Sequence, residues 1–175
     1  MFMLKKIKYS ETILNTTLKL IDKNKNLVVF GLGVDDPKGI FGTTLFKRKK
    51  YKKHFYDTPT SEASITGLAI GAALNKIKPI LVHQRVEFAL LTLDQIFNQA
   101  AKWHFMTNKK QNVPIVIRLI IGKGWGQGPQ HSQSLEAIFS HIPGLKVLSP
   151  SNALDAKKVL KYAVNDKNPV IIFEH

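Results

Sequence analysis

Residues 78–117 read KPILVHQRVEFALLTLDQIFNQAAKWHFMTNKKQNVPIVI and decide the fold. Two short, continuous apolar runs, at 80–82 and 113–117, predict strands that are buried on both faces. Between them, residues 91–107 predict an amphipathic helix, because apolar side chains recur there at helical spacing. These apolar residues are Leu93, Ile96, Phe97, Ala100 and Phe105. A strand–helix–strand unit of this kind makes the two strands parallel, with a right-handed crossover.

The same alternation extends towards both ends of the sequence. Residues 31–56 are rich in glycine and then basic and aromatic, which predicts a long loop with room for one helix. Ser10 is a candidate N-cap for the first helix. Further strands are expected at 27–30, 145–148 and 170–173, and further helices at 10–23, 61–74, 134–141 and 152–165. We therefore expect one domain over residues 1–175, a doubly wound α/β fold with a mainly parallel sheet and helices on both faces.

The composition is that of a globular protein, with 44% hydrophobic and 22% charged residues in 175. No apolar run approaches the roughly 20 residues that a membrane helix needs. The first ten residues, MFMLKKIKYS, lack the pattern of a secretory signal, so we expect a cytoplasmic protein. With zero cysteines, the chain has no disulfide, thiolate metal site or cysteine nucleophile.

The formal net charge of +14 raises the question of a nucleic-acid partner. Lysines are scattered along the chain, whereas nucleic-acid readers concentrate arginines and aromatic residues on one element. The one dense basic run is KRKKYKK at 47–53. We expect a solvated surface loop there, since charge runs are usually solvated, and an acidic partner or a nucleic acid are the alternatives.

Polar residues gather in three stretches that are expected beyond the carboxyl ends of the strands, at 57–62 just before a helix and at 83–88 and 120–132 after strands. In doubly wound sheets, ligands bind beyond the carboxyl ends of the strands. Glu62 stands in the first turn of a helix, where an acid interacts favourably with the helix dipole. Its alternative role is a carboxyl group that faces a ligand in a poorly hydrated pocket and exchanges protons. His131 is likewise either a capping and packing residue or a catalytic one.

The glycine-rich stretches do not carry a nucleotide motif. The loop at 122–130 reads GKGWGQGPQ, which lacks the GxxxxGK[ST] spacing of a phosphate-binding loop. Gly31-Leu32-Gly33 follows the first strand but lacks the third glycine of the dinucleotide fingerprint. Histidines and acids show no metal-ligand spacing, so no transition-metal site is expected from this chain alone.

Taken in order, several segments resemble the N-terminal pyrimidine-binding domain of the β subunits of 2-oxoacid dehydrogenase E1 components, which are transketolase-like thiamine-diphosphate enzymes. The likeness covers nearly the whole chain with almost no gaps. It rests on DTPTSE at 57–62 with GLAIGAA at 67–73, LDQIFNQAAK at 93–102, QHSQS at 130–134, PGLKV at 143–147, and Asp166 with NPV at 168–170.

The resemblance implies roles for individual residues. Glu62 matches the glutamate that hydrogen-bonds a ring nitrogen of the aminopyrimidine and so activates the cofactor. Phe88 matches the aromatic residue that packs on the aminopyrimidine, while Gln84 and Thr60 match positions near it. His131 matches a histidine beside the reacting carbon, which handles the acyl intermediate or its transfer.

The resemblance also implies cofactors and partners. Thiamine diphosphate would be bound with Mg²⁺, held mainly by a partner chain, because this sequence contains no GDG motif. The expected partners are an E1 α-like subunit and a separate chain with the C-terminal domain, in a hetero-oligomer. The diphosphate-binding and C-terminal domains are expected to be absent from this chain. Ala163, Asp166 and Asn168 match positions that hold a monovalent cation, such as K⁺, in some relatives.

Two departures from the family pattern keep other functions open. Many relatives carry an acidic pair where this chain has Leu32-Gly33, and the segment 83–87 is unusually charged. The alternatives are a subunit of a split transketolase-like enzyme that acts on sugar or specialised substrates, and a non-catalytic basic binding module.

Overall fold

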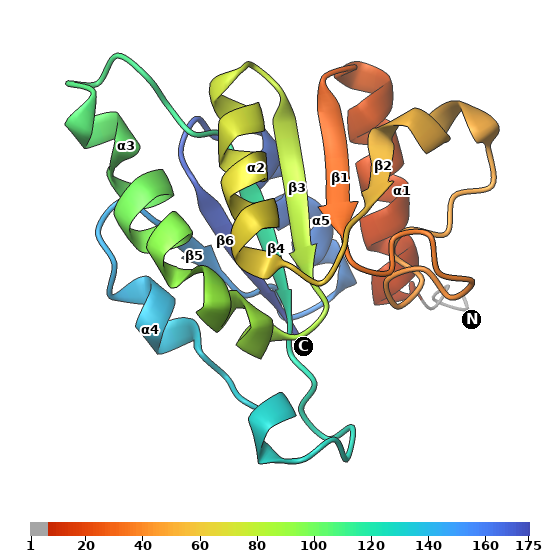
Figure 1. The fold of residues 1–175 in the computed structure, drawn as a ribbon. Coiled ribbons are helices and arrows are strands. Elements are labelled where there is room, and N and C mark those ends of the chain that lie inside the picture. The colour runs from red at the N-terminus through yellow and green to blue at the C-terminus, as the bar shows by residue number, and fades with distance from the viewer. Residues whose placement is uncertain (1–6) are drawn as a thin grey trace.

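A single sheet of six parallel strands forms the centre of the computed structural model, which describes residues 7–175. The strands lie in the order β2-β1-β3-β4-β6-β5 (Figure 1). They are β1 (Leu27–Gly31), β2 (Phe55–Asp57), β3 (Lys78–His83), β4 (Val116–Ile120), β5 (Lys146–Leu148) and β6 (Val170–Glu174). The predicted parallel, doubly wound α/β fold is confirmed. The absence of a signal sequence was inferred partly from residues 1–6, which lie outside the described residues.

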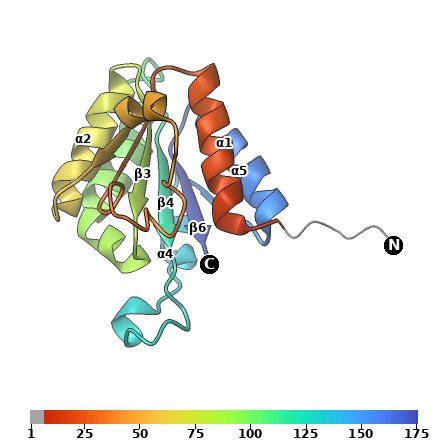
Figure 2. The same ribbon diagram turned by 90° about the vertical axis from the view of Figure 1, so that its right-hand side faces the viewer.

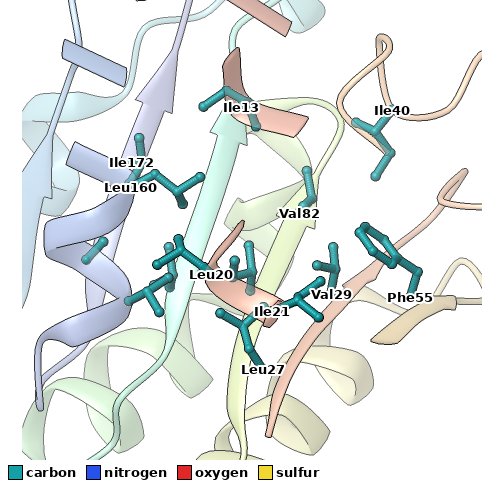
Figure 3. Close-up of a cluster of buried hydrophobic side chains, with 14 of the residues drawn as sticks. Ile13, Leu20, Ile21, Leu27, Val29, Ile40, Phe55, Val82, Leu160 and Ile172 are labelled. Atoms are coloured by element: carbon teal, nitrogen blue, oxygen red, sulfur yellow. The ribbon is translucent and has the colours of Figure 1, made fainter. Parts of the chain in front are cut away.

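Helices cover both faces of the sheet, as Figure 2 shows. Helices α1 (Tyr9–Lys23) and α5 (Ala153–Asn165) pack on one face, over an apolar cluster that includes Ile13, Leu160 and Ile172 (Figure 3). Helices α2 (Glu62–Leu74), α3 (Ala101–Met106) and α4 (Glu136–Ser140) lie on the other face. None of the helices in residues 7–175 is long and apolar enough to cross a membrane.

The first helix begins earlier than expected. Helix α1 starts at Tyr9, and Lys8 occupies the N-cap position without a side-chain hydrogen bond. Ser10 therefore lies inside the first turn and is not the N-cap. Asn152, predicted as the first residue of its helix, is instead the N-cap of α5, since its side chain accepts hydrogen bonds from the backbone N–H groups of Leu154 and Asp155.

Strand β4 is shifted by three residues from its predicted position. It runs over Val116–Ile120 rather than 113–117. The prediction followed the apolar run at 113–117, and the strand extends beyond it through Arg118, although charged residues are rarely buried. Arg118 is 2% exposed, however, and its guanidinium donates to both carboxylate oxygens of Glu174 on β6. This buried ion pair allows the strand to continue through a charged position.

The segment predicted as one amphipathic helix at 91–107 changes its winding twice. A 3-10 segment η2 (Val86–Thr92) is followed by a π-helical segment η3 (Asp94–Ala100) and then by α3. The Asp94 carboxylate accepts hydrogen bonds from the side chains of Asn98 and Gln99, four and five residues later. The wider π turn shifts the apolar face, so Phe105, expected in the core, is 83% exposed.

The stretch predicted as a loop at 31–56 contains regular structure at its end. A 3-10 helix η1 (Lys49–His54) leads directly into β2, a three-residue edge strand that the sequence did not indicate. The basic run is therefore only partly a solvated loop. Tyr51 is buried and donates to Asp22, while Lys50 and Lys52 pair with Asp22 and Asp35.

Two glycines differ in whether the structure leaves room for a side chain, and this difference can be tested by substitution. Gly144 has a φ of +103°, and a Cβ added there would overlap the Ala101 carbonyl oxygen. Gly71 lies within α2, and an added Cβ would meet no atom within 4 Å. The small residues of α2 therefore make no close backbone approach at this point within the described chain.

We expect Gly144→Ala to lower the free energy of unfolding by about 2 kcal/mol or more, because the substitution combines a left-handed backbone with a steric overlap. Gly71→Ala is the matched control and should raise it by up to about 1 kcal/mol, through helix propensity. Urea unfolding of both variants measures the difference. Equal effects of the two substitutions would contradict the packing described.

Candidate active site

The carboxyl ends of the strands bring three separate stretches of sequence together. In the sheet, Gly31 at the end of β1 is paired with Asp57 of β2 and with Val82 of β3. The segments that follow these strands therefore leave the sheet side by side. The glycine-rich segment 121–135 follows β4 and projects from the same edge (Figure 1). The predicted convergence of 57–62, 83–88 and 120–132 is thus what the structure shows.

The turn after β1 is held by two side chains from this edge. Asp57 Oδ1 accepts hydrogen bonds from the backbone N–H groups of Gly33 (2.7 Å) and Val34 (3.0 Å). The Gln84 side-chain amide donates to the Leu32 carbonyl. Gly33 has a φ of +82°, and a Cβ there would lie 2.7 Å from Gln84 Nε2, so the turn requires glycine. Gln84, a predicted cofactor-binding residue, therefore keeps its carbonyl oxygen for a ligand.

Glu62 faces a small cavity at the start of α2. Its side chain is half-buried, and its carboxylate makes no hydrogen bond or ion pair with any residue of 7–175. The cavity lining combines Glu62 with Leu32, Thr58, Pro59, Ile65, Gln84 and Phe88. Its volume of about 20 Å³ admits roughly one water molecule. A ring-sized ligand can therefore contact Glu62 and Phe88 but must lie across the mouth of the cavity.

His83 closes the floor of this cavity. It is the last residue of β3 and is 5% exposed, with Nε2 3.4 Å from Thr66 Oγ1 of α2. Burial lowers the pKa of His83 to about 4. The imidazole is therefore neutral at physiological pH, and it is a buried part of the wall rather than the ligand-accessible strand end that its sequence position suggests.

A second cavity, of about 260 Å³, adjoins the first and contains the predicted histidine. Gln84, Arg85, Phe88, Gln127 and His131 line it. Because Gln84 and Phe88 line both cavities, the two are adjacent. His131 ends the short 3-10 turn η4 (Pro129–His131), and its ring meets the Phe88 ring edge-on, with centroids 5.7 Å apart. Glu62, Phe88 and His131 are thus brought to one site.

Glu87 lies behind His131. Its carboxylate is buried, and Oε1 accepts a hydrogen bond from the Gln133 backbone N–H at 3.0 Å. Oε2 faces His131 Nδ1 at 3.9 Å, and neither atom has a hydrogen-bond partner among the described residues. A small movement would let them bond, so Glu87 is placed to orient the imidazole of His131.

Two aromatic residues of the site were not anticipated from the sequence. Phe41 and Trp125 pack against each other, with ring centroids 4.8 Å apart, and the Arg85 guanidinium lies 5.4 Å and 4.7 Å from their centres. The two glycines that flank Phe41, Gly39 and Gly42, are a sequence signal of an unusual turn. In the structure Phe41 has a positive φ of 48°. Its contact partners are more than 40 residues away in sequence.

Other predicted site residues stand apart from this centre. Thr60 is exposed and does not line the cavity, where Thr58 and Pro59 lie instead. Asp166 follows α5, and its carboxylate is bound by the Lys146 ammonium and the Asn168 backbone N–H. The monovalent-cation site near Ala163, Asp166 and Asn168 stays a prediction. No group of three or more histidine or acidic side chains suited to a metal occurs in residues 7–175.

Fold and site together define a parallel α/β domain. Beyond its strand ends lie an acid that pairs with no residue of 7–175, an aromatic ring and a histidine. The chain matches the family model for the transketolase pyrimidine-binding domain over residues 5–175. It is therefore a member of the transketolase pyrimidine-binding domain family.

Relatives point to one branch of that family. The chain is 43% identical over 152 residues to subunit beta of the acetoin:2,6-dichlorophenolindophenol oxidoreductase of Cupriavidus necator, covering 85% of this chain and 45% of that protein. It is 38% identical over 156 residues both to the mitochondrial pyruvate dehydrogenase E1 component subunit beta of Homo sapiens and to the 2-oxoisovalerate dehydrogenase subunit beta of Bacillus subtilis. These matches cover 89% of this chain, and 44% and 48% of the relatives.

A solved structure shares the fold. A split-gene transketolase, an inactive beta4 tetramer, superposes with a TM-score of 0.76 and 18% identity over 96% of this chain and 50% of that chain. The chain thus spans about half the length of these relatives.

The buried histidine makes stability depend on pH in a predictable direction. The unfolded chain takes up a proton at His83 near pH 6.5, whereas the folded chain does so near pH 4. Acidification through this interval therefore favours the unfolded chain, by about 3 kcal/mol in total. Urea unfolding should show that His83→Gln loses less stability than the unchanged protein when the pH is lowered from 7 to 4.5. The exposed His141 provides the control, since His141→Gln should lose as much as the unchanged protein.

Proposed function

We propose that this chain is a thiamine-diphosphate-dependent enzyme component like the β subunit of a 2-oxoacid dehydrogenase E1. It would contact the aminopyrimidine and act only together with a partner. The observation that carries the proposal is the Glu62 carboxylate, which bonds no side chain of the described residues and lines a cavity together with Phe88. The relatives named as β subunits of pyruvate, 2-oxoisovalerate and acetoin enzymes support it.

The residues present fit an aminopyrimidine ring. Glu62 has free carboxylate oxygens to bond a ring nitrogen, and Phe88 offers a ring for stacking. Gln84 has a free carbonyl oxygen, because its amide nitrogen is bonded to Leu32. When bound, thiamine diphosphate supplies the carbanion-type chemistry that cleaves and forms bonds at a carbonyl carbon.

The remaining side chains hold and move protons around that position. Glu62 exchanges a proton with the pyrimidine nitrogen. His131 lies beside Phe88, where it can donate a proton to, or accept one from, the reacting group, and Glu87 orients its ring. His83 stays neutral, which keeps a charge out of the cavity floor.

The small size of the cavity supports a partner requirement. A cavity of about 20 Å³ cannot enclose a ring, so a cofactor bound at Glu62 would extend out of it and offer a surface for another chain to cover. We propose that an E1 α-like chain covers this surface and supplies the diphosphate and Mg²⁺ site. The split-gene transketolase, whose beta4 tetramer is inactive, is consistent with such a division of one active site between chains.

A second candidate function is a subunit of a split transketolase-like enzyme acting on sugars. The charged Arg85 beside the second cavity favours it. Acyl transfer from the reconstituted complex to a lipoyl domain would support the dehydrogenase component, whereas transfer of a two-carbon unit to an aldose would support the second candidate.

The isolated chain should bind thiamine diphosphate weakly, and Mg²⁺ should not strengthen the binding, because the diphosphate site lies on the partner. Isothermal titration with and without Mg²⁺ measures this directly. Tight, Mg²⁺-dependent binding by the chain alone would refute the division of the site.

Glu62→Gln in the complex with the partner should slow exchange of the thiazolium C2 proton into deuterated water by about 100-fold or more, since proton transfer is lost. The matched control is Glu11→Gln, which removes another acid from the first turn of a helix. NMR of the bound cofactor follows the exchange. If both variants exchange as fast as the unchanged complex, Glu62 has no more than the helix-dipole role.

A further inference from the structure

Arg85 is a cation without an acidic partner at the edge of the second cavity. It makes no ion pair within residues 7–175, whereas the buried Arg118 is fully paired with Glu174. The neighbouring acid, Glu87, is directed to Gln133 and His131 instead. The positive charge of Arg85 is therefore not neutralised by the part of the chain that the structure describes.

Neutral groups hold the guanidinium in one orientation. Its Nε and Nη2 both donate to Gln127 Oε1, at 2.9 Å and 2.6 Å, and Nη1 donates to the Gln84 carbonyl at 2.9 Å. The Phe41 and Trp125 rings pack against it. A long, flexible side chain is thus fixed before any ligand arrives, which reduces the entropy lost on binding.

Two donors of this fixed group make no hydrogen bond to any residue of 7–175. A guanidinium carries five N–H donors, of which three are used here. The cavity of about 260 Å³ lies between this group and His131. Planar guanidinium groups with free N–H donors bind carboxylates and phosphates, and such charge-assisted hydrogen bonds are the strong ones.

The chemistry of the proposed reaction indicates which anionic group of the substrate Arg85 binds. In the proposed function, a 2-oxo acid loses its own carboxylate as carbon dioxide. An arginine bound to that carboxylate would stabilise the substrate more than the transition state and would slow the reaction. An anion that remains in the product can be held throughout without this penalty.

We propose that Arg85 and Gln127 form a subsite for a carboxylate or phosphate group that the substrate retains at the end remote from the reacting carbonyl. This inference rests on the proposed function for the position of the reacting carbon beside Phe88 and His131. It deepens that function, because it makes the substrate a dianionic 2-oxo acid or a phosphorylated sugar rather than one with an apolar tail.

The first test observes the guanidinium itself, without turnover. The Nε–H NMR signal of Arg85 in the full chain, assigned by its loss in Arg85→Lys, should shift on titration with glutarate, inorganic phosphate or both. A shift with glutarate alone assigns a carboxylate, and a shift with phosphate alone assigns a phosphate. The neutral glutaramide should leave the signal unchanged. No shift with either anion, or an equal shift with glutaramide, overturns the subsite.

The matched control is Lys123→Gln, which removes an exposed cation of the same glycine-rich loop. The Arg85 signal should still respond to the anion in this variant. If the response disappears, the anion is attracted by the general positive charge of the loop, and the specific subsite is refuted.

The second test compares substrates in the complex with the partner chain. 2-Oxoglutarate against 2-oxopentanoate, and xylulose 5-phosphate against xylulose, differ in the remote anion. Arg85→Gln should lower kcat/KM for the substrate with the remote anion about 10- to 100-fold, mainly through KM, and leave the value for the substrate without it unchanged. Equal losses for both substrates would show a structural role and overturn the proposal.

The two proposals fail in different ways. If the Arg85 signal responds to an anion but Glu62→Gln leaves C2-proton exchange unaltered, the anion subsite stands and the proposed function falls. If C2-proton exchange depends on Glu62 but Arg85 responds to no anion, the proposed function stands and the subsite falls.

Discussion

Parallel pairing of the strands is the constraint on which the site depends. Because all six strands point the same way, the segments that follow them leave from one edge of the sheet. Register pairs Gly31 with both Asp57 and Val82, so the first three strands end at nearly one level. Glu62 and Phe88 each come five residues after the end of a strand, β2 and β3 respectively. Their proximity therefore follows from sheet topology, although 26 residues separate them in sequence.

Polar contacts then fix this edge so that ligand-facing groups keep their positions. Asp57 and Gln84 bond backbone groups of the turn after β1, and Glu87 bonds the backbone of Gln133. Asp57 and Glu87 thus hold backbone groups of the site in place, and Gln84 does so through its amide nitrogen, while its carbonyl oxygen makes no hydrogen bond within residues 7–175. Glu62 differs from them, because its carboxylate makes no hydrogen bond or ion pair among the described residues. Arg85 differs because only neutral groups bond it there, with three of its five N–H donors. The Arg85 guanidinium is held in one orientation, and a group preorganised in this way binds without reorganising when the ligand arrives.

The sequence was sufficient for the fold because buried parallel strands are continuous apolar runs, which the chain shows clearly at β1, β3 and β6. It was insufficient where a tertiary contact overrides local pattern. The predicted strand at 113–117 lies three residues too early, and β4 continues through Arg118 because that residue is paired with Glu174, 56 residues away in sequence. The π turn in η3 displaced Phe105 from the core face, because a fixed helical period cannot include an inserted residue. For the site, family likeness located Glu62, Phe88 and His131, while the packing of Phe41 and Trp125 on Arg85 had no local signal.

The charges of Glu62 and Arg85, which pair with no other charge among the described residues, are explained if a ligand or a partner chain supplies the opposite group. At a surface in contact with water, a lone carboxylate or guanidinium costs little, because solvent screens it. When a partner surface and a ligand cover the site, the same charges act in a medium of lower dielectric, where each contact becomes stronger. An unpaired Glu62 and Arg85 would be a liability in a closed, self-sufficient pocket, since buried charge without a partner is strongly destabilising. Because Glu62 and Arg85 lie at an open site, the chain can fold without pairing them. Both charges are then available to a ligand or a partner chain in a complex.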